Sequence, residues 1–152
     1  GIKYMFFMRL SSHSNFLIKT ISRFIHRQLS YRYGFQIYRK TKIGGGFFIG
    51  HFGTVVISDN AIIGQNCNIG HCCTIGRTKG LKEGSPHIGN FVWIGTGAVL
   101  VGNINVEDHV MIAPNAFVNF DVPSHSIVIG NPGKIISRQN PTKNYINNAW
   151  LD

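Results

Sequence analysis

The chain has 152 residues, of which 43% are hydrophobic and 14% are charged, enough for one domain with a packed core. Its longest uninterrupted apolar run, residues 4–8, is too short for a membrane span or the apolar part of a secretory leader, so we expect neither. Eighteen glycines argue against a helical bundle. The three cysteines, Cys67, Cys72 and Cys73, cannot all pair, which predicts a cytoplasmic protein with free thiols.

The formal net charge of +9 is concentrated at one end. Residues 1–42 contain nine Lys or Arg and no acidic residue, whereas residues 43–152 contain six of each sign. This change in composition predicts three parts: a basic helical segment over 1–42, a main domain over 43–136 and a tail over 137–152.

The basic segment has the apolar spacing of an amphipathic helix. Ser12 or Ser14 is expected to cap its start and Gly34 to end it. The helix either packs its apolar face on the protein, which we favour, or contacts an anionic membrane surface. A nucleic-acid partner is not expected, because no binding motif frames the basic residues. The apolar stripe consists of Leu17, Ile18, Ile21, Phe24, Ile25 and Leu29.

The remaining chain repeats with a period of six. Aliphatic residues stand at every sixth position in one stretch: Ile88, Ile94, Leu100, Val106, Ile112 and Val118. Small or aliphatic residues follow each of these by four: Val92, Ala98, Ile104, Val110, Ala116 and Val122. An upstream stretch has the same pattern: Ile57, Ile63, Ile69 and Ile75, with Ala61, Cys67 and Cys73. Ile43 and Ile49 show the same six-residue spacing still further upstream, shifted by two residues from the register of that stretch.

A period of six matches neither a helix nor simple alternation, and predicts coils with three short faces stacked around an aliphatic column. We interpret the cysteines at 67 and 73 as inward-facing and structural, and the one at 72 as lying at the coil surface. Glycines and asparagines are expected to turn the chain between faces with positive φ. The candidate turn residues are Gly64, Asn66, Gly70, Gly89, Asn90, Gly95 and Asn115.

Several segments resemble the hexapeptide-repeat acyltransferases, and among them the short serine-acetyltransferase-like enzymes of polysaccharide gene clusters. The resemblance is carried by residues 49–57 (IGHFGTVVI), 68–76 (NIGHCCTIG), 95–98 (GTGA), 121–126 (DVPSHS) and 130–135 (GNPGKI). Breaks in the repeat at 50–56 and 77–87 also match that family. The resemblance implies an all-β fold, a left-handed parallel β-helix with a short N-terminal α-helix, assembled as a homotrimer.

The same resemblance implies an O-acetyltransferase that uses acetyl-CoA as co-substrate and transfers the acetyl group directly to a hydroxyl. His51 aligns with the family's catalytic base, a role that imidazole suits near neutral pH. The coenzyme A positions are Thr78, Gly95, Thr96, Ala113, Pro114 and Lys134. The positions expected to line the acceptor pocket are Gly50, His71, Ser85 and His87.

The acceptor pocket departs from that of the serine enzymes. Gly50, Gly84 and Ser85 stand where the family has charged residues, which favours a sugar or polysaccharide precursor over an amino acid. A true serine O-acetyltransferase is the alternative. A zinc-dependent β-helix hydratase is disfavoured because the sequence lacks a close histidine pair, so no metal is expected. A non-catalytic β-helix scaffold is the other alternative, and it leaves His51 and Lys134 unexplained.

Overall fold

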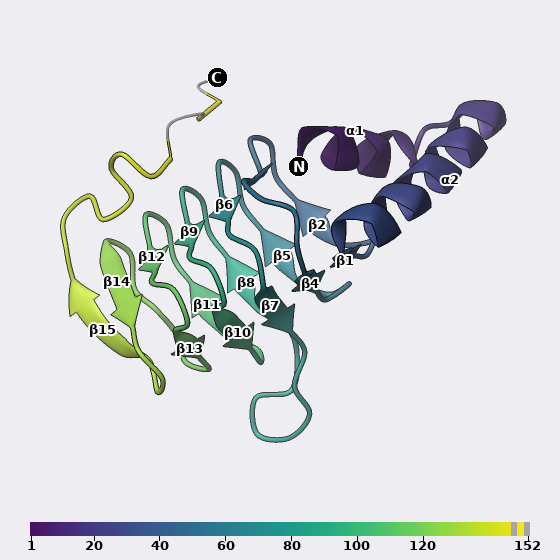
Figure 1. Cartoon of the computed structure of the whole chain (residues 1–152). Helices are drawn as coiled ribbons and strands as arrows, with labels where there is room; N and C mark the ends of the chain where they lie inside the picture. Colours follow the sequence, from purple (N-terminus) through teal and green to yellow (C-terminus); the bar gives the residue numbers. More distant parts are fainter. Residues whose placement is uncertain (147–148, 151–152) are drawn as a thin grey trace.

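The computed structural model describes residues 1–146 and 149–150, and it confirms the parallel β-helix. The first four coils each contribute one short strand to each of three sheets, and the fifth contributes none to the second sheet (Figure 1). The first sheet contains β1 (Phe35–Ile37), β4 (Val55–Ile57), β7 (Cys73–Gly76), β10 (Val99–Val101) and β13 (Phe117–Val118). The second contains β2 (Lys42–Ile43), β5 (Ile62–Ile63), β8 (His87–Ile88) and β11 (Asn105–Val106).

The third sheet reaches from the first coil to the last. It contains β3 (Phe48–Ile49), β6 (Asn68–Ile69), β9 (Trp93–Ile94), β12 (Met111–Ile112), β14 (Ser126–Ile129) and β15 (Lys134–Ser137). All of its pairings are parallel except that of β14 with β15, which closes the helix as an antiparallel hairpin. From there the tail runs back along the third sheet, where the Asn68 side chain donates to the Tyr145 carbonyl at 2.9 Å (Figure 1).

The predicted hexads form the core. From Ile57 to Val118, every aliphatic residue at the sixth positions is buried, and so is every companion residue. Cys67 and Cys73 are fully buried among them, as expected, and Cys72 is exposed. Ile49 also points inward, whereas Ile43 is only half-buried at the first coil.

The expectation that the turn glycines have positive φ was wrong at Gly64, Gly70, Gly89 and Gly95. None of them has a positive φ, and left-handed φ values at the corners fall instead on Asn66, Asn115 and several larger residues (Cys72, Phe91, His109 and His125). The glycines are needed for stacking: a Cβ on Gly64 would lie 2.5 Å from the carbonyl oxygen of the next coil's glycine. Asn90 also has no positive φ; its side chain accepts from the Gln65 amide at 2.8 Å.

The basic segment forms two helices and begins the first sheet. Helix α1 (Ile2–Leu10), not expected from the sequence, covers the open end of the core with Tyr4, Met5 and Met8. Helix α2 (Phe16–Tyr33) packs on α1 and ends at Gly34 as predicted, with φ 74°. Its cap is Asn15 and not a serine: the Asn15 side chain accepts from the amides of residues 17 and 18.

Within one chain, most of the apolar stripe of α2 does not pack on the main body, and its packing on a neighbouring copy stays a prediction. Ile25 and Leu29 are half-buried, but the other four members are exposed: Leu17, Ile18, Ile21 and Phe24. The face that packs inward carries Ser22 and His26. None of the helices in the described part of the chain is long and apolar enough to cross a membrane.

Candidate active site

The predicted catalytic histidine lies where the third sheet turns into the first. We call this column of turns the His51 corner; it comprises residues 50–54, 70–72, 95–98 and 113–116. Ile49 pairs with Ile69 before the corner and Val55 with Cys73 after it, so the first turn is two residues longer than the next. This insertion is the break in the repeat expected near 50–56, and it leaves His51 exposed on the surface.

The long turn is fixed through its backbone to the end of α2. The Gly53 amide donates to the Tyr33 carbonyl at 2.9 Å, and the Val55 amide donates to the Gly34 carbonyl at 3.2 Å. Gly53 has φ 129°, and a Cβ there would lie 3.3 Å from the His71 Cβ, so the turn needs glycine at this position. The turn is therefore anchored on both sides of the histidine that it presents.

His51 stands edge-on to His71, with the two ring centroids 5.7 Å apart and the planes at 82°. His71 in turn lies 3.4 Å from the Thr96 hydroxyl through Nδ1, and its carbonyl accepts from the Gly97 amide. Within residues 1–146 and 149–150, His51 itself has no hydrogen-bond partner. The unprotonated nitrogen of a neutral His51 imidazole is thus free to accept a proton from an incoming hydroxyl.

Small residues continue the column beyond the histidines. Gly95 is buried, and a Cβ on it would lie 2.6 Å from the Pro114 nitrogen, so coil stacking accounts for its size. The Asn115 amide donates to the Thr96 carbonyl, which links the next turn to the same stack. Seven predicted site residues consequently share one corner: Gly50, His51, His71, Gly95, Thr96, Ala113 and Pro114.

Three other predicted residues belong to a different corner, between the first and second sheets. The loop after β7 projects there (Figure 1). Thr78 bridges Gly84 across the loop and donates from its hydroxyl to the Lys82 carbonyl at 2.7 Å. Ser85 is buried with its hydroxyl 2.8 Å from that of Ser58, and His87 follows on β8 with an exposed side chain.

The last predicted coenzyme A residue, Lys134, begins β15 at the opposite end of the β-helix from the helices and is exposed (Figure 1). The structure of one chain therefore does not bring it, or the projecting loop, to His51. Phe52, next to His51, was not among the predicted site residues. It lies in the same turn of the His51 corner, and 79% of its surface is exposed. The only signal for it in the sequence was the break in the repeat.

The three thiols differ sharply in accessibility. Burial raises the pKa of the Cys67 thiol to about 12 and also raises that of Cys73. Both are inert core groups, whereas Cys72 lies exposed in the turn after His71. No group of three His, Cys, Asp or Glu suited to a metal ion occurs in the described ranges.

Comparison with known proteins agrees with the repeat. The family described as bacterial transferase hexapeptide (six repeats) matches residues 85–119. The chain thus carries the hexapeptide repeat of this transferase family. This hexapeptide-repeat chain is 35% identical over 119 residues to serine acetyltransferase 2 of Arabidopsis thaliana, a match covering 78% of the chain and 37% of that protein.

Solved structures give the same relationship. Serine acetyltransferase of Brucella abortus in complex with coenzyme A superposes with a TM-score of 0.74 and 28% identity, over 90% of this chain and 54% of that one. The Neisseria gonorrhoeae serine acetyltransferase in complex with serine superposes with a TM-score of 0.68 and 30% identity. That match covers 87% of this chain and 53% of the other. The hexapeptide-repeat chain thus spans about a third to a half of the length of these relatives.

Proposed function

We propose that the protein is an acetyl-CoA-dependent O-acetyltransferase of the serine acetyltransferase type. The observation that carries this proposal is the His51 corner, where a two-residue insertion presents an exposed histidine above His71 and Thr96. Structures of coenzyme A and serine complexes of serine acetyltransferases superpose on most of the chain. A non-catalytic scaffold gives no reason for the insertion or for the free imidazole.

In the proposed reaction, His51 accepts the proton of the acceptor hydroxyl as the oxygen attacks the thioester carbonyl carbon. The carbon–sulfur bond breaks when the tetrahedral intermediate collapses, and the proton passes to the departing thiolate. No covalent acyl-enzyme is required. Among the chain's own groups, the Gly53–Tyr33 backbone hydrogen bond holds the turn that positions His51.

A homotrimer would complete this site. Thr78, Ser85 and His87 lie at a different corner from His51 in one chain, so a coenzyme A groove built from both sets needs a neighbouring copy. Coenzyme A is proposed to lie along the small residues of the His51 corner, with Lys134 pairing with one of its phosphates. Size-exclusion chromatography with light scattering tests the trimer, and a monomeric mass would contradict it.

L-Serine is the acceptor that the relatives favour, because the proteins that match are serine acetyltransferases. A sugar hydroxyl is the second candidate, and a specific feature of this chain supports it. The residue before His51 is Gly50, and Gly84 and the buried Ser85 stand in the loop after β7, so none of these three positions offers a charge to an amino acid's carboxylate or ammonium.

The decisive experiment measures coenzyme A release from acetyl-CoA by the purified chain, with L-serine or an aminosugar as acceptor. Faster turnover with serine supports the first acceptor, and faster turnover with the sugar supports the second. Release that no hydroxyl acceptor stimulates, together with no saturable binding of coenzyme A, would contradict the enzyme proposal.

We also propose a cytoplasmic protein that contacts the inner membrane face through α2. Phe16, Leu17 and Phe24 are each about two-thirds exposed or more on this helix, beside Lys19 and Arg23. An exposed apolar face flanked by basic residues is the pattern of an interfacial helix. No acidic residue in residues 1–42 opposes an anionic surface.

A further inference from the structure

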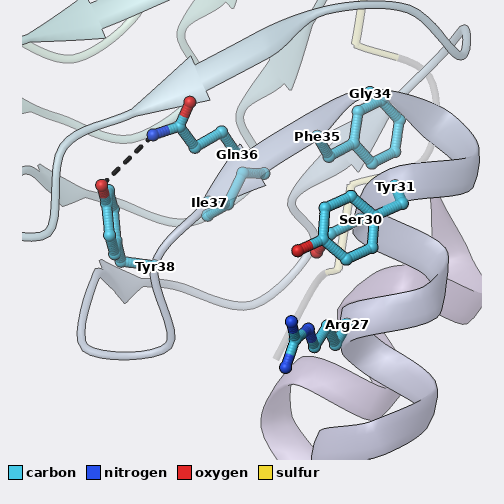
Figure 2. Close-up of a pocket in the computed structure, with 8 residues that line it drawn as sticks. All are labelled: Arg27, Ser30, Tyr31, Gly34, Phe35, Gln36, Ile37 and Tyr38. Atoms are coloured by element: carbon cyan, nitrogen blue, oxygen red, sulfur yellow. Dashed lines mark hydrogen bonds between the residues drawn. The ribbon is translucent and has the colours of Figure 1, made fainter.

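A groove separates helix α2 from the segment formed by β1 and the turn after it. Two adjoining cavities of about 450 and 460 Å³ lie there. They share Arg27, Ser30, Ile37 and Tyr38, and therefore form one continuous depression. Figure 2 shows the first cavity, with the side chains of α2 on one side and those of β1 opposite. We call it the α2–β1 groove.

Three arginines line the groove, and no carboxylate of the described residues pairs with them. Arg23 and Arg27 lie one turn apart on α2, and Arg39 comes from the turn after β1. The ion pair found within residues 1–146 and 149–150 is Arg77–Glu83, in the distant loop. Because like charges at i and i+4 on a helix repel, an anion shared by these guanidinium groups would stabilise the arrangement.

Arg27 is held by a neighbour on the same helix. The Arg27 guanidinium carbon lies 5.7 Å from the centre of the Tyr31 ring, close enough for a cation–π contact. The Tyr38 hydroxyl accepts from the Gln36 side chain at 3.2 Å, so its own hydrogen remains available to an anion (Figure 2). Three guanidinium groups and a hydroxyl donor thus border the same depression.

His26 adds a second observation that points to a missing partner. It lines the groove, only 6% of its surface is exposed, and its Nε2 has no hydrogen-bond partner in the described part of the chain. Buried polar atoms are nearly always paired in folded proteins. Burial, and then the nearby Arg39 charge, lower the pKa of His26, and a bound anion would offset the second effect.

We propose that the α2–β1 groove binds a phosphoryl group, carried either by a soluble phosphate ester or diphosphate or by a lipid headgroup. Guanidinium groups match the geometry of phosphate oxygens and stay charged at any physiological pH. The groove is not the proposed coenzyme A site, because Lys134 lies at the other end of the β-helix (Figure 1). Binding here does not depend on the acetyltransferase activity, and it can be tested without turnover.

The test is calorimetric titration of the full chain with pyrophosphate at physiological salt. The groove variant combines Arg27→Gln with Arg39→Gln, and the matched control combines Arg138→Gln with Lys143→Gln, which loses the same charge from exposed positions outside both the groove and α2. We expect saturable binding that falls at least tenfold in the groove variant and stays within twofold in the control. Undetectable binding by the natural chain, or an equal loss in both variants, would overturn the proposal.

Vesicles distinguish the two sources of the phosphoryl group. Retention on phosphatidic acid vesicles that the groove variant alone loses identifies a lipid headgroup, and pyrophosphate binding without such retention identifies a soluble ligand. Thermal unfolding of each variant checks that it is folded. If the double groove variant is not, Arg39→Gln alone, in an exposed turn, replaces it, with at least a threefold loss expected. An affinity unchanged by this single variant would equally overturn the proposal.

Discussion

His51 depends on backbone hydrogen bonds for its position, with no side-chain carboxylate in the described structure to orient its ring. The Gly53 amide and the Val55 amide tie its turn to the end of α2, and His71 contacts the ring from the next coil. This arrangement leaves the histidine exposed but confined, which suits a base that must meet a substrate from solvent.

Replacing His51 with alanine should therefore remove catalysis without disturbing the fold. We expect His51→Ala to lower kcat/KM for acetyl transfer at least a hundredfold, the lower range for loss of a general base, while coenzyme A binding and thermal stability are retained. His71→Ala, one coil away, serves as the comparison and should cost less. Full activity in the His51 variant would assign the base to another residue.

The three thiols allow a second test at the residue scale. The raised pKa values of Cys67 and Cys73 and their burial predict that neither reacts with an aromatic disulfide reagent at pH 8 in the folded protein. Only Cys72 should react quickly, and Cys72→Ser should abolish the fast phase. In denaturant all three should react. Rapid labelling of more than one thiol in the folded state would show that the core opens readily.

At the scale of the element, each coil packs directly on the next through its glycines. A Cβ on Gly64 would meet the Gly89 carbonyl at 2.5 Å, whereas a Cβ on Gly45 would find its nearest neighbour at 3.9 Å. Backbone atoms cannot move aside as a flexible side chain can, so position 64 should not accommodate a side chain without strain.

We expect Gly64→Ala to lower the free energy of unfolding by about 1–3 kcal/mol, the usual cost of overpacking. Gly45→Ala should change it by no more than about 0.5 kcal/mol. Urea unfolding followed by circular dichroism measures both. Equal midpoints for the two variants would show that the coils can separate slightly, and that stacking does not require glycine at this position.

The coils were predictable from the sequence because every inward-facing residue packs in the same column, against the equivalent residues of neighbouring coils. The hexads from Ile57 to Val118 have one environment, a column of like residues, so composition at a fixed period is enough to locate them. The breaks around His51 and in the 77–87 loop were visible as shifts in that period. Helix α1 was not, because a nine-residue helix with a weak pattern is fixed by the open core end that it covers.

The site was predictable to the extent that it follows the coil stack. His51, His71 and Thr96 meet because each stands at the same position of successive turns, which the repeat reveals. The α2–β1 groove was hidden, since Arg39 reaches Arg23 and Arg27 only through the way that α2 packs beside β1. A contact between a helix and a strand produces no repeat in the sequence from which it could be predicted.

The whole molecule is polarised along the β-helix axis. Its helical end carries all of the excess positive charge and the exposed apolar face of α2, while the rest of the chain is neutral (Figure 1). Pairing α2 with the same segment of another copy would bring two strongly basic segments together, which Coulomb repulsion disfavours. An anionic lipid surface complements both the charge and the apolar side chains.

We expect the full chain to sediment with vesicles containing anionic lipid at low salt, and with neutral vesicles much less. Each basic residue near the surface adds about 1 kcal/mol, and salt screens it over a Debye length of about 8 Å at physiological ionic strength. Leu17→Ser combined with Phe24→Ser should weaken binding at every salt concentration, because both side chains are exposed and their loss removes only apolar contact with lipid. Ser14→Ala combined with Thr20→Ala, exposed polar changes in the same region, is the control. Recovery of the natural chain in the supernatant with every vesicle would exclude the membrane contact and leave the apolar face for a neighbouring protein.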